Sequence, residues 1–365
     1  VRTGAYTSPH IFTPLERIQI DGVNVEEDSF CRAISKIAEV EKDVGRNITY
    51  FEILTVASLL CHAEAGVEVA AYEVGIGGRL DATQVVHSSV SIITSISYDH
   101  MDKLGNTLEM IAKEKCGIIR RGVPVVSASQ EKEAEKVIMS KAYEMESPLY
   151  IVGGNIITSG TRKNFSVSVE GRLFENLSTR LLGNFQVENC ACALTAVYLL
   201  HKMGLVPQIE DSAIRKAIGE TFIGGRMEVL MEKPLVVVDG SHNGESVAAA
   251  LSALKEEFSP ARILVLFGCA TDKDVVRMAR AMASERVDSV FVVGGFSPRS
   301  FAPHELANAL KHYGNLNVRP FLSVEEAVSV ALNEAKDSDA VIALGSFYLI
   351  PDIVRYIKRG LSRGK

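Results

Sequence analysis

Glu73 is the residue of this sequence whose type and position most directly suggest chemistry. It follows the mostly apolar segment 67–72 and precedes glycines at positions 75, 77 and 78. A strand over 67–72 would deliver the carboxylate to the carboxyl edge of an open α/β sheet, where ligands bind, and glycines let the backbone approach a ligand closely. Mg²⁺ beside a phosphate commonly takes one or two carboxylates. The segment therefore predicts a magnesium site, although the glycine run alone would also fit a turn with a solvated glutamate.

Three more polar residues are expected near the same edge. Ser8 ends a strand over 2–9, His100 follows a strand over 90–96, and Lys115 lies on a helix over 108–117. The carboxyl ends of parallel strands converge, so a hydroxyl, a carboxylate and an imidazole could hold a divalent cation together. A buried lysine can be neutral, and a neutral amine can add CO₂ to become a carbamate, which is an anionic oxygen ligand. The alternative for Lys115 is an ordinary charge on a helix surface.

The composition limits the classes of function. The chain has 365 residues, a net charge of −6 and 47% hydrophobic residues, which is enough for two domains with separate cores. The chain has no excess of basic residues, so nucleic acid is not a favoured partner. No apolar run has transmembrane length, and no signal peptide is evident. The six cysteines fit a reducing cytosol better than a disulfide framework, and Cys190 and Cys192 are expected to pack on a helix rather than to bind metal.

The elements that would position these residues alternate between strand and helix, which predicts a mostly parallel, doubly wound sheet in a first domain over residues 1–222. Asp28 and Ser29 are expected to cap a helix, and a second helix is expected to begin at Tyr50. Short alternating runs over 149–182 predict a small antiparallel addition, followed by a long helix over 185–203. The expected strands cover residues 2–9, 67–72, 90–96 and 123–126. The other expected helices cover residues 108–117 and 131–146.

Residues 223–365 predict a second, Rossmann-like α/β domain after the glycines at 224 and 225. Its expected strands cover 235–239, 263–267, 289–293 and 340–344, with a weaker one at Val318. No G-x-G-x-x-G follows the first of these strands, so we expect no nicotinamide site. Instead this strand ends in Asp239-Gly240-Ser241-His242-Asn243.

Several motifs occur in an order typical of one family: YTSPH followed by ERI, TYFE, EVGIGGRLDAT, DHMDKLG, EKCGI, LLGNFQ, GGRME, DGSHN, TDKD and GSFYLI. Over almost its whole length the chain resembles the folylpolyglutamate synthase/dihydrofolate synthase family of the Mur ligase superfamily. The resemblance implies an ATP-dependent amide ligase that adds L-glutamate to dihydropteroate and/or (poly)glutamylated tetrahydrofolate through an acyl phosphate. It also implies a cytoplasmic monomer that requires ATP and Mg²⁺, with a Mur-type ATPase domain and a C-terminal Rossmann-like domain.

The resemblance carries specific roles to matching positions. It implies metal binding by Ser8, Glu73, His100 and a carbamylated Lys115. It implies substrate binding by Thr49, Tyr50, Phe51, Glu52, Leu80, Asp81 and Ala82. It implies ATP binding by Asn189, Arg226, Asp239 and His242. Lys115, His242 and Arg226 are the expected catalytic groups, and the role of Lys273 in TDKD is open.

One family motif has no match in these 365 residues. The P-loop G-x-x-x-x-G-K-[ST] should precede YTSPH, so we expect that about fifty N-terminal residues of the family pattern, including the first strand, are absent here. A truncated or misassigned start is the favoured explanation, because the downstream catalytic positions are all filled. The alternative is an ATPase-deficient folate-binding or regulatory pseudoenzyme. A ligase for cell-wall precursors is disfavoured by TYFE and TSPH. Smaller departures are Phe185 and Gly244, where the family usually has His and Pro.

Overall fold

The computed structural model describes residues 1–45 and 47–363, which fold into two compact units. The first unit comprises Val1–Ile96, Thr107–Ile151 and Cys192–Gln208, and the second comprises Ser97–Asn106, Val152–Ala191 and the chain from Ile209 onward. The predicted domain limits of 1–222 and 223–365 stay a prediction.

A four-stranded sheet organises the N-terminal part of the first unit. Its order is β3-β2-β1-β4, where β1 is Thr3–Tyr6, β2 Ile18–Ile20, β3 Val23–Asn24 and β4 Val69–Tyr72. β1 runs parallel to β4 and antiparallel to β2, and Tyr6 lies opposite both Tyr72 and Ile18. This register brings the residues after β1, those after β4 and those before β2 to one edge of the sheet.

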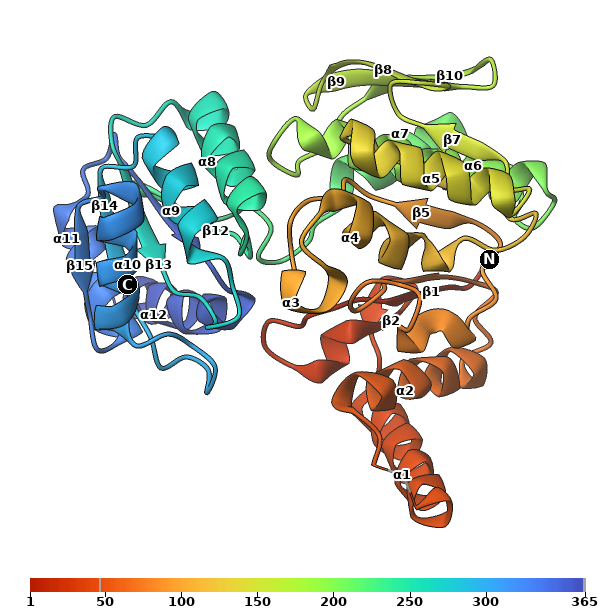
Figure 1. Cartoon of the computed structure of the whole chain (residues 1–365), viewed down its shortest axis with the longest axis horizontal. Helices are drawn as coiled ribbons and strands as arrows, with labels where there is room; N and C mark the ends of the chain where they lie inside the picture. Colours follow the sequence, from red (N-terminus) through yellow and green to blue (C-terminus); the bar gives the residue numbers. More distant parts are fainter. Residues whose placement is uncertain (46, 364–365) are drawn as a thin grey trace. The chain divides into compact units, whose positions relative to one another are not determined.

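Helix α2, Tyr50–Glu64, packs against this sheet and lies beside α1, Glu27–Val44 (Figure 1). Tyr6, Ile18 and Leu54 are among the buried residues of the shared core. The predicted cap of α1 at Asp28 and Ser29 is wrong. Glu26 occupies the N-cap, no side chain caps the helix, and Asp28 lies in the first turn. In the first turn the Asp28 carboxylate still interacts favourably with the helix dipole. An acidic residue at this position is therefore compatible with a helix that begins before it.

The rest of the first unit contains a parallel three-stranded sheet of order β5-β6-β7. These strands are Ser91–Ile93, Val125–Ser127 and Leu149–Ile151. The connecting helices are α4, Leu108–Lys115, and α5, Lys132–Glu144, and a 3-10 turn over Cys116–Ile118 follows α4. Helix α6, Phe185–Lys202, contributes its second half to this unit. The strand–helix alternation predicted from the sequence is confirmed.

The second unit contains the predicted antiparallel addition as strands β8, β9 and β10, which are Ile156–Thr161, Asn164–Val169 and Arg172–Leu177. Its large sheet has the order β11-β12-β16-β13-β14-β15. These strands are Glu228–Glu232, Leu235–Val238, Ala340–Leu344, Ile263–Phe267, Ser289–Val292 and Val318–Pro320. β11, which the sequence pattern does not reveal, pairs antiparallel at one edge, and the other pairs are parallel.

The helices of this unit are α3, Met101–Leu104; α7, Asp211–Glu220; α8, Gly244–Phe258; α9, Val275–Ser284; α10, Pro303–Gly314; α11, Val324–Glu334; and α12, Ile350–Arg363. α8, α9 and α10 pack together, and α11 packs with α12, as expected for a doubly wound sheet (Figure 1). The last strand along the chain, β16, lies between β12 and β13. The Rossmann-like prediction is confirmed, and the residues after β12, β13 and β16 meet at the switch point of the sheet.

Candidate active site

Ser8 and Glu73 lie together at the edge of the four-stranded sheet. The Ser8 backbone N–H donates to Glu73 Oε2 over 2.6 Å, and the Glu73 N–H donates to the Tyr6 carbonyl over 2.8 Å. The adjacent parallel strands β1 and β4 hold both residues just past their carboxyl ends. A hydroxyl beside a carboxylate is an oxygen donor set of the kind that Mg²⁺ prefers. The chemistry of these two residues therefore fits the predicted metal.

The glycine loop after Glu73 packs directly on the end of α4. A Cβ atom on Gly78 would lie 2.8 Å from the Lys115 carbonyl oxygen, and one on Gly117 would lie 2.3 Å from the Arg79 Cα. The Arg79 N–H donates to the Glu114 carbonyl over 2.9 Å. Only residues without a Cβ allow this approach. The structure thus brings two sequence motifs together, EVGIGGRLD and EKCG, and places Lys115 beside the loop that begins at Glu73.

Gln84 ties the same two segments. Its Nε2 donates to the carbonyl oxygens of Gly78 and Gly117 over 2.7 and 2.9 Å. The side chain of Arg79 adds an ion pair to Glu114 with a nitrogen–oxygen distance of 3.0 Å. Sequence reasoning gave Gln84 no role, because only the folded chain shows that one amide reaches both carbonyls.

Asp81 shapes the glycine loop from inside. Its Oδ2 accepts from the backbone N–H groups of Gly75 and Ile76, each over 3.1 Å, and its Oδ1 accepts from the N–H and hydroxyl of Thr83. The neighbouring Leu80 is 80% exposed, and Ala82 begins a 3-10 turn that Asp81 caps. Asp81 therefore holds the backbone of the segment predicted to bind substrate, while Leu80 presents an apolar side chain to solvent.

The TYFE motif forms the start of α2. Thr49 is the N-cap: its hydroxyl accepts from the Glu52 N–H, and Glu52 Oε2 accepts from the Thr49 N–H over 2.7 Å, which completes a capping box. The hydrogen bonds from the Thr49 hydroxyl and N–H lower the pKa of Glu52. Phe51 lies against Gly75, where a Cβ would come within 2.6 Å of its ring. Half of this predicted substrate-binding motif thus caps a helix, while Phe51 contacts the glycine loop.

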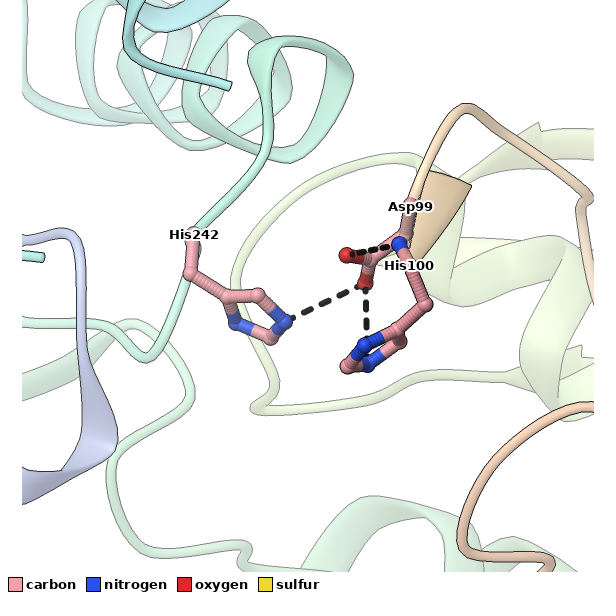
Figure 2. A group of neighbouring side chains, drawn as sticks. All are labelled: Asp99, His100 and His242. Carbon is pink, nitrogen blue, oxygen red and sulfur yellow. Dashed lines mark hydrogen bonds and ion pairs between the residues drawn. The ribbon is translucent and has the colours of Figure 1, made fainter. Parts of the chain in front are cut away.

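A second cluster lies in the second unit, where Asp99 gathers two imidazoles and a lysine. Asp99 Oδ2 is 3.2 Å from His242 Nε2 and 3.9 Å from His100 Nε2 (Figure 2). Lys273 Nζ donates to Asp99 Oδ1 over 2.9 Å, and its side chain is only 12% exposed. His100 is held by its own backbone, which has a φ of 47° and donates its N–H to Asp99 Oδ1. Ligand atoms of Asp99, His100 and His242 are close enough to share a metal ion.

The electrostatics of this cluster favour an ionised carboxylate. Burial acts to raise the pKa of Asp99, but the hydrogen bonds and charges of His242 and Lys273 overcome it and lower the pKa well below its usual range. Burial lowers the pKa of His100, which keeps a neutral imidazole available as a ligand. His242 faces acceptor oxygens with both ring nitrogens, since Nδ1 lies 2.8 Å from the Gly240 carbonyl. Donation to both oxygens requires an imidazolium, whereas binding a metal through Nε2 would leave only the Nδ1 contact with the Gly240 carbonyl.

The remaining predicted ATP ligands also lie in the second unit. Asp239 is buried and accepts hydrogen bonds from the Met227 N–H and from the N–H and hydroxyl of Ser241. It therefore joins the GGRM loop to the DGSH loop. Arg226 is exposed, with its guanidinium carbon 4.6 Å from the centre of the Phe347 ring. Asn189 is exposed on α6 and donates to Gln186 Oε1 over 2.9 Å.

Ser8, Glu73 and Lys115 thus belong to the first unit, and the predicted residues His100, Arg226, Asp239 and His242 belong to the second. The sharing of metal by His100 and Lys115 stays a prediction, as do the ATP contacts. Sequence reasoning missed Asp99, which stands directly before His100 in the DH motif, and left Lys273 open. Asp99 and Lys273 form an ion pair although they are 174 positions apart in the chain. The spacing of residues in the sequence gives no sign of such a contact. None of the helices among residues 1–45 and 47–363 is long and apolar enough to cross a membrane.

Comparison with known proteins defines first the class and then the family. The Mur ligase middle domain matches residues 28–197, and the Mur ligase glutamate ligase domain matches residues 225–347. The chain is thus built as a Mur-type ligase.

Individual relatives agree with this class. Dihydrofolate synthase/folylpolyglutamate synthase of Bacillus subtilis is 31% identical over 368 residues, which cover 97% of this chain and 84% of the relative. The structure of Mycobacterium tuberculosis folylpolyglutamate synthase complexed with ADP has a TM-score of 0.90 at 27% identity. That match covers 98% of this chain and 84% of the M. tuberculosis chain. The structure of E. coli FolC in complex with DHPP and ADP has a TM-score of 0.88 at 29% identity. That match covers 100% of this chain and 83% of the E. coli chain. The chain belongs to the folylpolyglutamate synthase/dihydrofolate synthase family.

Proposed function

We propose that this protein is an ATP-dependent ligase that joins the amino group of L-glutamate to the carboxylate of dihydropteroate and/or of (poly)glutamylated tetrahydrofolate, through an acyl phosphate. Family membership supports the reaction class. The solved relative that binds DHPP together with ADP supports a pteroate substrate and a nucleotide. The relatives' names include both dihydrofolate synthase and folylpolyglutamate synthase, so both acceptor classes are retained.

The observation that carries the proposal is the packing of the glycine loop on the end of α4. This contact places Glu73, the exposed Leu80 and Lys115 on adjoining segments of one unit. The carboxylate proposed to bind metal, the side chain proposed to contact substrate and the lysine proposed to be carbamylated therefore lie on contacting segments. An ordinary turn with a solvated glutamate would not need Gly78 and Gly117 to lie against opposing backbone.

Substrate binding is assigned to the surface around this loop. Phe51 and Leu80 offer apolar contact to a planar ring system, and Asp81 and Thr49 keep the supporting backbone in place. Rigid support matters because a displacement of about 1 Å at a reacting group can cost a hundredfold in rate.

Metal and nucleotide binding are assigned to the polar residues that the sequence motifs single out. Ser8 and Glu73 would hold Mg²⁺, and His100 with a carbamylated Lys115 would hold a second ion. Bound MgATP supplies the phosphoryl group that activates the carboxylate. Arg226 and an imidazolium His242 are donors that can offset negative charge on that group. Asp239 fixes the two loops that carry Arg226 and His242.

Phosphate release tests the proposal. The protein is supplied with MgATP, L-glutamate and either dihydropteroate or tetrahydrofolate, and phosphate is measured with each component omitted in turn. We expect release that requires glutamate and one of the pteridine substrates, and a loss of at least a hundredfold in Glu73→Gln. Glu39→Gln, an exposed change on α1, is the matched control and should retain full activity. Binding of a pteridine without any turnover would instead favour a folate-binding regulatory protein.

Two further assignments belong to the proposal. All six cysteines are free, which supports a reducing compartment such as the cytoplasm. A monomer is expected from the family resemblance, and sedimentation of the purified protein would test it.

A further inference from the structure

Arg17 is a buried cation at the same sheet edge as Ser8 and Glu73. It is 5% exposed and stands directly before β2, whose first residue, Ile18, lies opposite Tyr6. The Thr7 N–H donates to the Arg17 carbonyl over 2.9 Å. β2, β1 and β4 are consecutive in the sheet. Adjacent strands are about 4.8 Å apart, so the backbone of Arg17 is about 10 Å from that of Glu73.

The groups around the Arg17 guanidinium are neutral. Its Nε donates to His10 Nδ1 over 2.9 Å, and its guanidinium carbon lies 5.6 Å from the centre of the Tyr50 ring. Because His10 Nδ1 accepts this hydrogen bond, it carries no proton and the imidazole is uncharged in this arrangement. The Tyr6 hydroxyl lies near the same guanidinium and accepts a hydrogen bond from the Thr55 hydroxyl over 3.2 Å. These contacts orient Arg17 without neutralising it.

The acidic groups nearby are committed elsewhere. Both carboxylate oxygens of Glu16 accept from the backbone N–H groups of residues 11–13, over 2.8 to 2.9 Å. The Asp81 carboxylate accepts from the glycine loop and from Thr83. Among residues 1–45 and 47–363, no carboxylate forms an ion pair with Arg17.

An unpaired buried cation is costly, and proteins normally supply it with an anion. A guanidinium whose Nε is fixed by a hydrogen bond still presents its Nη groups, which bind carboxylates in a planar, bidentate way. We propose that Arg17 binds the carboxylate of the pteroyl substrate and orients it toward the Ser8–Glu73 pair. This inference rests on the proposed function, since it requires a substrate that carries a carboxylate. Arg17 belongs to the ERI segment of the family motifs, but the resemblance assigns it no role.

A ligand-by-variant comparison tests the inference. Binding of dihydropteroate and of its carboxamide is measured by calorimetry on the wild-type protein and on Arg17→Gln, without Mg²⁺ or nucleotide so that the metal does not contribute. A hydrogen bond from a guanidinium is stronger to a carboxylate than to a neutral carboxamide. We therefore expect the wild-type protein to prefer the carboxylate by about tenfold or more, and the variant to bind both ligands about equally. Arg17→Lys, which keeps the charge without the fork, should retain part of the preference.

The outcomes separate the two proposals. Equal affinities of the wild-type protein for the carboxylate and the carboxamide would overturn the proposed role of Arg17. This measurement uses the wild-type protein alone, so it does not depend on whether the variant folds. A carboxylate preference that survives unchanged in a folded Arg17→Gln protein would overturn it as well. A wild-type protein that binds neither ligand and releases no phosphate would instead contradict the proposed function. Arg32→Gln, on the exposed surface of α1, is the matched arginine control and should leave the preference intact.

Discussion

Gly117 and Arg79 touch backbone to backbone: a Cβ atom placed on Gly117 would lie 2.3 Å from the Arg79 Cα. This contact joins the glycine loop after Glu73 to the end of α4, where Lys115 lies. The relation explains why glycine occurs in both motifs. It also makes the position of Lys115 depend on a loop whose centre is almost forty residues earlier in the chain.

Gly117→Ala is expected to separate these segments. Overpacking a close contact costs about 1–3 kcal/mol, and here the opposing atoms are backbone, which relaxes poorly. We expect a lower midpoint in urea and a loss of phosphate release of more than tenfold. Gly219→Ala is the control, because its Cβ would meet only the Ser178 carbonyl at 3.6 Å. Equal stability of the two variants would contradict the close approach.

Leu80→Ala tests the assignment of substrate contact to an exposed side chain. Exposed substitutions usually change stability by less than about 0.5 kcal/mol, whereas fully burying a leucine against a ligand contributes about 1.5–3 kcal/mol. We expect KM for the pteridine substrate to rise about tenfold with unchanged unfolding. Leu322 is equally exposed, at 81% against 80%, and Leu322→Ala should leave KM unchanged. A similar KM for the Leu80 variant and the wild-type protein would remove Leu80 from the binding surface.

Asp99 and Lys273 should be energetically coupled. Their side chains are 24% and 12% exposed, and the nitrogen–oxygen distance is 2.9 Å. A double-mutant cycle with Asp99→Asn and Lys273→Gln is expected to give a coupling of about 1 kcal/mol in urea unfolding. The exposed pair Glu109 and Lys113 should give a smaller value, because solvent screens it. Additive effects at Asp99 and Lys273 would show that the pair does not persist in solution.

Asp239→Ala should reduce stability as well as nucleotide affinity. The carboxylate accepts three hydrogen bonds, from Met227 and Ser241, and leaving buried donors unpaired costs about 1–3 kcal/mol. Asp239→Asn, which keeps one acceptor oxygen, should lie between the wild-type protein and the alanine variant. Calorimetry with ATP and urea unfolding measure the two effects separately. A fully stable alanine variant would mean that these loops are held by other contacts.

His62 should make stability depend on pH. It is 4% exposed and lies 2.8 Å from the Tyr72 hydroxyl and 3.1 Å from the Gln19 carbonyl. Burial lowers its pKa from the ordinary 6.5. Below about pH 6.5 the unfolded chain therefore binds more protons than the folded one, so stability is full above this pH and falls as pH decreases toward the folded pKa.

His62→Gln should reduce this slope, measured as urea midpoints between pH 5 and 8. It should not abolish the slope, because burial also lowers the pKa values of His10 and His100. An unchanged slope in the variant would show that His62 does not titrate in this range.

The sequence by itself determined the alternation of strands and helices, the Rossmann-like series after residue 223, and the positions of Ser8 and Glu73 at strand ends. These follow from periodicity and from the convergence of parallel strands, which are local or topological properties. The sequence could not fix where α1 begins, since Glu26, Glu27 and Asp28 all suit a helix start. It also missed β11, because an edge strand alternates weakly.

The tertiary structure alone decided what each polar side chain contacts. Asp81 and Thr49 have the residue types of ligand-binding groups, yet they hold a loop and a helix end through backbone N–H groups. Asp99 meets Lys273, and Arg17 is buried with no acidic partner among the residues that the structure describes. The folded backbone brings distant segments together and commits the carboxylates near Arg17 to backbone N–H groups. A hydrogen bond depends on distance and angle in space, and neither can be read from residue type or spacing.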